Sequence, residues 1–409
     1  MTSHSLDEHR ADVLALLSPL APLNLSLADA VGCVMVADYV APRAVPPLAL
    51  ASRDGYAVRS LDTRGARAQP VTLRITHDAL PGGSPTRLAP GAAVRVVRGA
   101  ALPFGADAVV VRGEGTAASV TVDGEAAPGA GVMGVGAEVA EGSVIVAAGR
   151  RLTAGHVVAL AACGAASVTV RPSPRVVIIV VGSEIEPRGR SPHPAVAPEE
   201  PVAESPGPML AVLVEAIGAR VVRVASVPDD APSLRASIDD AAIQADLVIT
   251  VGGLSSDWND VVEPVLSHAY GVEVRTVRLS PGGRHGLGTI GPGDGRPVVL
   301  LALPGHPVEA AAAFAAYLSD ALLELRGAAS VPARARAAAG VGWPSPFGFA
   351  QVVAVERQRG SGGATIAPVG DPLAPTLSDM AAADGLALIA EATTEVREGD
   401  GIDVLWWAR

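Results

Sequence analysis

The chain has 409 residues, of which 49 % are apolar but only 3 % aromatic, and its formal net charge at pH 7 is −11. At roughly 150 residues per domain, this length predicts two to four domains, with largely aliphatic cores. The acidic balance argues against nucleic acid as the main partner, because binding it needs a basic face. With no recognisable signal peptide and no apolar run long enough to span a bilayer, we expect a cytoplasmic protein that binds no membrane.

The first predicted element is a helix near the N-terminus. Ser5 and Glu8 fit a capping box, and apolar residues follow until the chain reaches Pro19. A second apolar run, 28–37, has helix-like spacing. From residue 70 to about 125, short apolar segments are broken by Gly and Pro, a pattern typical of a small β domain inserted into another unit.

At Arg175 the pattern changes. Residues 176–181 form a continuous β-branched run, which is typical of a parallel strand covered on both faces. Similar runs recur at 221–227, 247–251, 272–279 and 298–302. Because strands and helices alternate, we predict a doubly wound α/β domain. Beyond residue 332, four short strand-like runs predict a small β barrel.

The most informative stretch of this domain is 247–260, which reads LVITVGGLSSDWND. A strand that ends in Gly252-Gly253 and turns into a helix brings backbone N–H groups close to a ligand, and the helix N-terminus favours an anion. The competing interpretation is structural: Asp257 caps the helix and Asp260 lies in its first turn. From this stretch alone, the two interpretations are equally well supported.

Several loops that follow strands should gather at one edge of the sheet. Gly-rich turns and helix N-termini supply N–H donors to an oxyanion, and Asp260, Asp257 and Glu184 are suited to hold Mg²⁺, which prefers carboxylates and substrate phosphates. The expected site binds a phosphate-bearing small molecule with metal assistance. Its candidate ligand-binding residues are Gly182, Ser183, Gly252, Gly253, Ser255, Ser256, Pro281, Gly282, Arg284, Pro304, Gly305, His306 and Pro307.

Four segments, in their order along the chain, resemble one known family. They are the Asp-Gly-Tyr-Ala motif at 54–57, the segment 99–109, the Gly252-Gly253 loop and Pro304-Gly305-x-Pro307. Together they resemble the molybdopterin molybdenumtransferases, the MoeA family that includes the gephyrin E domain, over nearly the whole chain. The resemblance implies an elongated homodimer whose active cleft lies between the α/β domain of one chain and the inserted β domain of the other.

The resemblance also implies a division into domains. The predicted segments are 1–21 (an N-terminal helix that packs with the α/β domain), 22–40 with 141–174 (a linking domain), 41–140 (the inserted β domain), 175–329 (a molybdopterin-binding α/β domain like MogA and MoaB) and 330–409 (a C-terminal β barrel).

The activity that the resemblance implies belongs to molybdenum cofactor biosynthesis. Family members use molybdate and Mg²⁺ to convert adenylylated molybdopterin into molybdenum cofactor, and they release AMP. Carried over to this chain, the catalytic carboxylates are Asp54, Glu138, Glu184 and Asp260, and the metal ligands are Asp260 and Glu184. A molybdopterin adenylyltransferase is the protein partner that the resemblance suggests.

The chain departs from the family at the anion site. Ser280 and Gly283 stand where the family's K-P-G-K-P motif has lysines. In one hypothesis, Arg284, Arg278 or His285 replaces the lost charge and the enzyme still inserts metal. In the other, the protein is a catalytically degenerate homologue that binds molybdopterin or a partner protein without metal insertion. A nucleotide-processing hydrolase is a more distant alternative, against which the surrounding domains argue.

Overall fold

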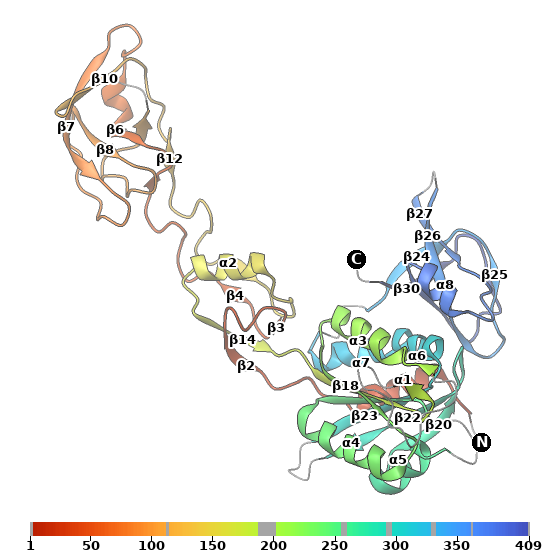
Figure 1. Cartoon of the computed structure of the whole chain (residues 1–409). Coiled ribbons are helices and arrows are strands. Elements are labelled where there is room, and N and C mark those ends of the chain that lie inside the picture. Colours follow the sequence, from red (N-terminus) through yellow and green to blue (C-terminus); the bar gives the residue numbers. More distant parts are fainter. Residues whose placement is uncertain are drawn as a thin grey trace. The chain divides into compact units, whose positions relative to one another are not determined.

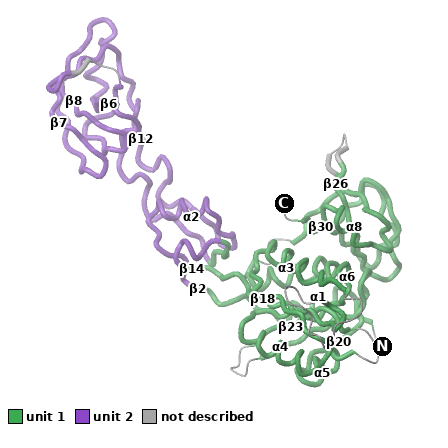
Figure 2. The backbone as a smooth tube through the Cα atoms, viewed as in Figure 1, with its two compact units in different colours: residues 1–23, 32–36, 169–409 green, residues 24–31, 37–168 purple. Residues whose placement is uncertain are grey.

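The computed structural model describes residues 3–111, 114–186, 202–254, 260–291, 297–328, 333–360 and 363–407. The chain forms two compact units (Figure 2): unit 1 contains residues 1–23, 32–36 and 169–409, and unit 2 contains 24–31 and 37–168. The predicted α/β and barrel segments lie in unit 1, and the predicted inserted β segment lies in unit 2. No helix among the described residues is long and apolar enough to cross a membrane.

The centre of unit 1 is a seven-stranded sheet. Its strand order is β1 (Ser3–His4), β20 (Glu273–Val277), β22 (Arg284–Ile290), β23 (Val298–Leu303), β19 (Leu247–Val251), β15 (Arg175–Val181) and β18 (Arg220–Val227). The last four strands are parallel neighbours. The doubly wound domain is therefore confirmed, with one departure from the expected alternation: β22 follows β20 without a helix and runs antiparallel to both β20 and β23.

Helices cover both faces of this sheet (Figure 1). Along β15, Val176 and Ile178 belong to one buried core and Val177 and Ile179 to the other, because side chains alternate between the faces of a strand. The first face carries α1 (Leu6–Ala15), α3 (Pro206–Ile217), α6 (Pro307–Ala313) and α7 (Ser319–Leu325). The π-helical turn η2 (Phe314–Leu318) joins α6 to α7. The second face carries α4 (Ala231–Gln244) and α5 (Val262–Tyr270).

The predicted capping box of the N-terminal helix is confirmed. The Ser5 hydroxyl accepts the N–H of Glu8 at 3.1 Å, and the Glu8 carboxylate accepts the N–H of Ser5 at 2.8 Å. Leu6 and Val13 of α1 are buried in the core of the first face, and β1 pairs with β20 beside it. The N-terminal segment is thus built into the α/β domain.

The C-terminal part of unit 1 is a closed five-stranded barrel. Its ring is β26 (Ala350–Gly360), β27 (Gly363–Pro368), β24 (Ala335–Ala339), β30 (Gly401–Trp406) and β28 (Gly385–Ile389), which pairs with β26 again. The predicted barrel is confirmed. Strand β21 (Leu279–Ser280) reaches out of the α/β domain and pairs with β26, while α8 (Leu377–Ala382), β25 (Trp343–Pro344) and β29 (Glu395–Val396) complete this part.

Unit 2 is built around a six-stranded sheet. Its order is β10 (Glu114–Gly115), β11 (Ser119–Val122), β7 (Val71–Ala79), β8 (Ala92–Val96), β6 (Gly55–Val58) and β9 (Ala108–Val110). Two short pairs follow, β5 (Leu50–Ala51) with β12 (Val132–Met133) and β4 (Tyr39–Val40) with β13 (Val144–Val146), together with α2 (Ala154–Ala162) and the 3₁₀ turn η1 (Ser60–Thr63). Two further strands, β2 (Leu23–Ser26) and β14 (Ser167–Arg171), include residues of both units, and β3 (Val34–Met35), β16 (Ile185–Glu186) and β17 (Val202–Ala203) belong to unit 1.

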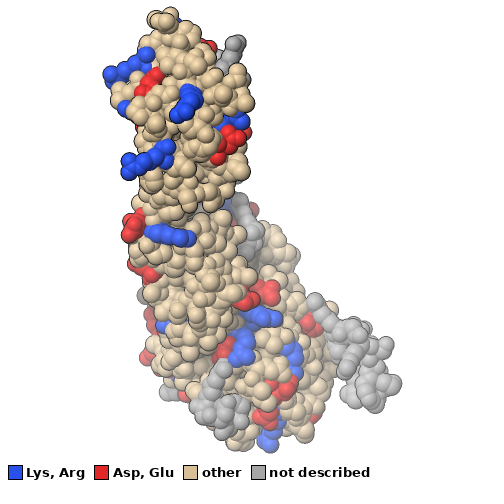
Figure 3. Space-filling view, turned by 90° about the vertical axis from the view of Figure 1, so that its left-hand side faces the viewer, with Lys and Arg blue, Asp and Glu red and all other residues tan. Residues whose placement is uncertain are grey.

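The surface charges of the chain come from arginine and from acidic residues, since all 31 basic residues are arginine. On the face drawn in Figure 3, arginine and acidic side chains are interspersed rather than gathered into a basic surface. That face offers no continuous electrostatic track for a nucleic-acid backbone.

Candidate active site

A glycine turn at the carboxyl end of β19 forms the middle of the site. Gly252 has φ 97° and lies so close to the carbonyl oxygen of Val181 that a Cβ would overlap it. Gly253 has φ 64°, and a Cβ there would overlap the side chain of Val262. Both positions require glycine for conformation and for space, and the bare backbone of the turn faces a pocket, as the sequence pattern predicts.

The loop after β15 is fixed to the loop after β18 by a reciprocal pair of hydrogen bonds. Ser183 donates its N–H to Asp229 Oδ2 at 2.7 Å, and Asp229 donates its N–H to Ser183 Oγ at 2.9 Å. The carboxylate of Glu184 lies over Gly182, where a Cβ would meet Glu184 Oε1 at 2.7 Å. Asp229 is a site residue that the sequence reasoning missed, although an acid directly after a predicted strand was a usable signal.

Asp260 lies between the glycine turn and helix α5. Its Oδ1 accepts the N–H groups of Val262 at 2.9 Å and Glu263 at 3.4 Å, so the Asp260 side chain caps α5 from the position before Val261 and does not lie in its first turn. Its Oδ2 is buried and has no hydrogen-bond partner within the described residues. Burial raises the pKa of Asp260 above its usual value. Asp257, the other predicted cap, lies outside the described residues.

These loops enclose a pocket of about 240 Å³. Three acids, Glu184, Asp229 and Asp260, line it together with the backbone of Gly252 and Gly305. The pocket therefore combines carboxylates with glycine backbone at the carboxyl edge of a parallel sheet, the place where α/β folds bind their ligands.

A second pocket, of about 410 Å³, shares Gly253 and Gly305 with the first. It is lined by Gly253, Leu254, Gly282, Gly283, Arg284, Pro304, Gly305 and Glu309. Arg284 donates from Nη2 to Glu263 Oε2 at 2.6 Å, so its charge is already paired. The two acids Glu263 and Glu309 lie early in their helices, and nothing in the sequence pattern singled them out.

Two other candidates for the missing positive charge are placed elsewhere. Arg278 donates from Nε and Nη2 to Glu391 Oε2, at 3.1 and 2.9 Å. His285 is fully buried and shares a hydrogen bond of 2.9 Å with the hydroxyl of Tyr317. Burial lowers the pKa of His285 to about 3. Full burial and the lowered pKa both argue against His285 as the residue that offsets anionic charge.

The other predicted site residues fall into three groups. Pro304 lines the second pocket, while the exposed His306 and the following Pro307 begin helix α6. Pro281 follows β21 and is not among the residues that line that pocket. Ser255 and Ser256 lie outside the described residues.

Two predicted catalytic acids, Asp54 and Glu138, belong to unit 2. Both are exposed, and Asp54 Oδ1 accepts the N–H of Arg98 at 2.7 Å. The Asp-Gly pair does not make a simple hairpin, because β6 pairs with β8 and β9 and not with β5. Gly55 packs against the carbonyl oxygen of Val110 so closely that no side chain fits there.

Three family models match successive parts of the chain. They are the MoeA N-terminal region (domain I and II) over residues 4–164, the "Probable molybdopterin binding domain" over 177–324 and the MoeA C-terminal region (domain IV) over 336–407. The solved MoeA protein of Pyrococcus horikosii superimposes with a TM-score of 0.78 at 26 % identity and covers 100 % of both chains.

Proteins named molybdopterin molybdenumtransferase match over nearly the full length of the chain. Molybdopterin molybdenumtransferase 2 of Mycobacterium tuberculosis is 33 % identical over 417 residues, 98 % of each chain. The molybdopterin molybdenumtransferase of Staphylococcus aureus is 26 % identical and covers 95 % of this chain and 92 % of its own. With a full-length relative at this identity and the same multidomain fold, the chain belongs to the molybdopterin molybdenumtransferase family of molybdenum cofactor biosynthesis, as a divergent member.

Proposed function

We propose that this protein inserts molybdate into adenylylated molybdopterin in a Mg²⁺-dependent reaction that releases AMP. The observation that carries the proposal is the geometry of Asp260. One of its oxygens is used by the cap of α5, and the other is buried at the wall of the pocket without a protein partner among the described residues. A buried carboxylate oxygen is costly unless a cation or donor satisfies it, so this atom supports a ligand at that place.

The residues of this pocket fit Mg²⁺. The ion takes oxygen ligands and is usually bound by one or two carboxylates plus substrate phosphates and water. Asp260 and Glu184 are the residues that would hold it. Within the described part of the chain, no group of three or more His, Cys, Asp or Glu is placed for a metal. Bound there, Mg²⁺ would neutralise phosphate charge.

The protein residues themselves bind and orient the substrate in this proposal. The backbone at Gly252 and Gly253 allows a phosphate or pterin group to approach closely, since neither residue has a side chain. Arg284 lines the adjacent pocket together with Gly283, one of the two positions of the missing lysines. Because the substrate carries an AMP group, another enzyme must attach it first, and a molybdopterin adenylyltransferase is the partner we propose.

A second candidate function is binding without metal insertion. The observation that favours it is the pairing of Arg284 with Glu263, together with Glu309 in the same pocket. A dianion needs several donors and a nearby cation to leave water, and here the cation is shared with an acid. A protein with this pocket would bind molybdopterin and not process it.

Incubation of the purified protein with adenylylated molybdopterin, Mg²⁺ and a molybdate series separates the two functions. We expect AMP release that rises with molybdate in the parent and is lost in Arg284→Ala. Tight pterin binding with no AMP release at any molybdate concentration would leave binding as the only function.

Restoring both lysines should strengthen molybdate use. A Cβ on Gly283 would meet no atom within 4 Å, so Gly283→Lys fits the loop. In Ser280→Lys with Gly283→Lys, we expect half-saturation at a molybdate concentration about tenfold lower, since a charge-assisted hydrogen bond contributes ~1.5 kcal/mol. An unchanged concentration dependence would show that these two positions do not contact the anion.

We also infer that the chain is a homodimer. The family membership supports this. Light scattering at micromolar concentrations should give twice the mass of 41.0 kDa. A constant monomer mass over that range would contradict the inference.

A further inference from the structure

The loop 278–283 lines the second pocket with its tip, Gly282 and Gly283, where there is no side chain to pack. Leu279, nearer the start of the loop, is buried in the core of the first face. Gly282 has φ 126°, and a Cβ on Gly283 would meet nothing within 4 Å. The loop connects β20 to β22, and a hydrogen bond closes its base: Val277 donates its N–H to the carbonyl oxygen of Gly283 at 2.7 Å. Beyond that base, its position depends on contacts with other parts of unit 1.

The C-terminal barrel supplies the first of these contacts. Ser280 lies opposite Gln351 and Leu279 opposite Ala350, where β21 runs parallel to β26. Ala350 donates its N–H to the carbonyl oxygen of Arg278 at 2.9 Å. The outer side of the loop is therefore an added strand of the barrel, while its inner side, at Gly282 and Gly283, lines the pocket.

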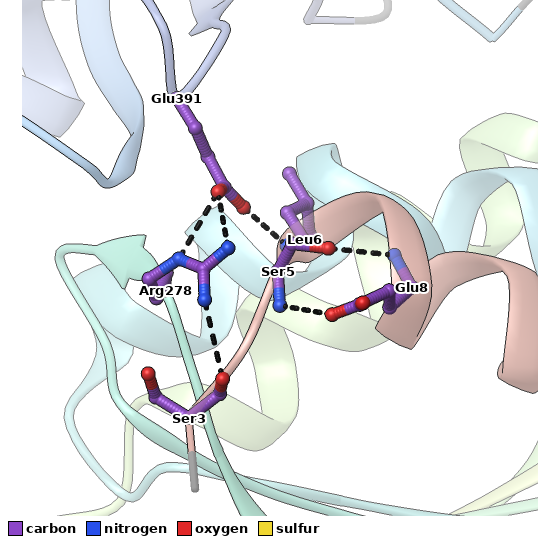
Figure 4. Close-up of polar contacts among 6 residues, drawn as sticks. All are labelled: Ser3, Ser5, Leu6, Glu8, Arg278 and Glu391. Carbon is purple, nitrogen blue, oxygen red and sulfur yellow. Dashed lines mark hydrogen bonds and ion pairs between the residues drawn. The ribbon is translucent and has the colours of Figure 1, made fainter.

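Arg278 and Glu391 supply the second contact, drawn in Figure 4. Glu391, in the turn after β28, accepts two N–H groups of Arg278 on Oε2, and its Oε1 accepts the N–H of Leu6 at 2.5 Å. Arg278 donates from Nη1 to the carbonyl oxygen of Ser3 at 3.2 Å, and its own N–H goes to the carbonyl oxygen of His4 at 2.9 Å. One carboxylate thus joins the barrel, the start of α1 and the pocket loop.

The strength of this contact comes from its geometry. The side chains are 33 % and 23 % exposed, and a single exposed ion pair contributes little. Here, however, both oxygens of Glu391 accept charge-assisted or backbone hydrogen bonds, and the planar guanidinium fork of Arg278 fixes direction as well as distance. The carboxylate also lies at the N-terminus of α1, where the helix dipole favours negative charge.

We propose that Arg278 and Glu391 are positioning residues for the oxyanion pocket, through which the C-terminal barrel sets the place of the loop 280–283. The identity of the oxyanion as molybdate rests on the proposed function. The proposal that the barrel sets the position of the loop does not depend on it. Arg278 is therefore not a substitute for the missing lysines in this proposal, because its guanidinium donates to Glu391 and to the carbonyl oxygen of Ser3.

Hydrogen exchange of the protein without substrate tests the control of the loop. In Arg278→Met and in Glu391→Ala, amides of residues 277–286 should exchange about tenfold faster, while amides of the buried strand β19 keep their protection. Arg223→Met is the matched control: it removes an arginine of similar exposure, 31 %, from an ion pair with the more exposed Asp240, 48 %, elsewhere in unit 1. Parental exchange at 277–286 in both test variants would overturn the proposal.

The kinetics of AMP release test the consequence for the pocket. We expect the KM for molybdate to rise about tenfold in Glu391→Ala with kcat within about threefold, and an intermediate KM in Arg278→Lys, which keeps the charge but loses the fork. An unchanged KM in an active enzyme with faster loop exchange would also overturn the positioning role. If the parent releases no AMP, the proposed function fails, and the exchange experiment still decides whether the barrel controls the loop.

Discussion

Asp260→Asn should lower the rate of AMP release by two or more orders of magnitude and leave the free energy of unfolding nearly unchanged. Asparagine is as good an N-cap as aspartate, so its side-chain oxygen still accepts the N–H groups of Val262 and Glu263. What the variant loses is the negative charge on the buried oxygen that faces the pocket, which is needed to bind Mg²⁺. Rates and urea unfolding measured on one preparation separate the two roles.

Two further variants calibrate this result. Asp260→Ala removes cap and charge together, and it should lose ~1 kcal/mol of stability in addition to the activity. Asp230→Asn is the matched control, because Asp230 caps α4 in the same way, with Oδ1 accepting the N–H of Ser233 at 2.8 Å, and lines neither pocket. If Asp260→Asn keeps the parental rate, Asp260 is a structural cap and not a catalytic residue.

The parts of the fold that the sequence predicted well are those in which local pattern and burial agree. The strand β15 is a continuous β-branched run because both of its faces are covered, and α1 begins at a capping box whose two hydrogen bonds form as the residues predict. The Gly252-Gly253 turn was predictable for the same reason, since a positive φ and a close backbone approach both demand glycine.

The antiparallel strand β22 was missed because its sequence does not resemble a strand. Gly286 and Gly288 weaken the pattern, yet they are needed there: a Cβ at either position would lie 2.9 Å from a side-chain atom of Ala302 or Val272. This requirement arises from tertiary packing between neighbouring strands. The apolar run 28–37 failed as a helix for a local reason, because Gly32 takes φ 85° and the chain forms turns and β3 instead.

The charges of the site were the least predictable feature. Arg284 and Glu263 are 21 residues apart, and Arg278 and Glu391 are 113 apart, so no spacing rule pairs them. The sequence showed correctly that acids and glycines follow the strands. It did not show that two of the three candidate cations, Arg284 and Arg278, are paired with acids, or that the third, His285, is buried.

Stability should fall steeply as the pH is lowered, because two buried histidines of unit 1 cannot accept protons in the folded state. His9 and His285 are both fully buried, with ring centroids 5.5 Å apart, and burial lowers their pKa values to about 2 and about 3. Arg275, which donates from Nε to His9 Nδ1 at 3.1 Å, further disfavours a second positive charge, although Asp12 pairs with it on the outer side. Tyr317 stays protonated beside them.

The sign of the effect follows from which state binds the protons. Well above pH 6.5, the pKa of a histidine in the unfolded chain, both rings are neutral in the folded and the unfolded chain, and the full stability is present. As the pH falls towards the folded pKa values, only the unfolded chain takes up protons, and each histidine costs about 1.4 kcal/mol per pH unit. Two histidines therefore give a slope of about 2.7 kcal/mol per unit between roughly pH 6 and pH 4.

His285→Gln isolates one of the two contributions. The variant can still accept the Tyr317 hydroxyl but cannot take up a proton in the unfolded state, so the slope should fall by about 1.4 kcal/mol per pH unit. Tryptophan fluorescence reports this unfolding for unit 1 alone, because all four tryptophans, at positions 258, 343, 406 and 407, belong to it. His268→Gln, at an exposed position of α5, is the control and should leave the slope of the parent unchanged. A parental slope in His285→Gln would mean that His285 titrates normally in the folded protein, and a charged His285 would then be available to replace the lysines that the anion site lacks.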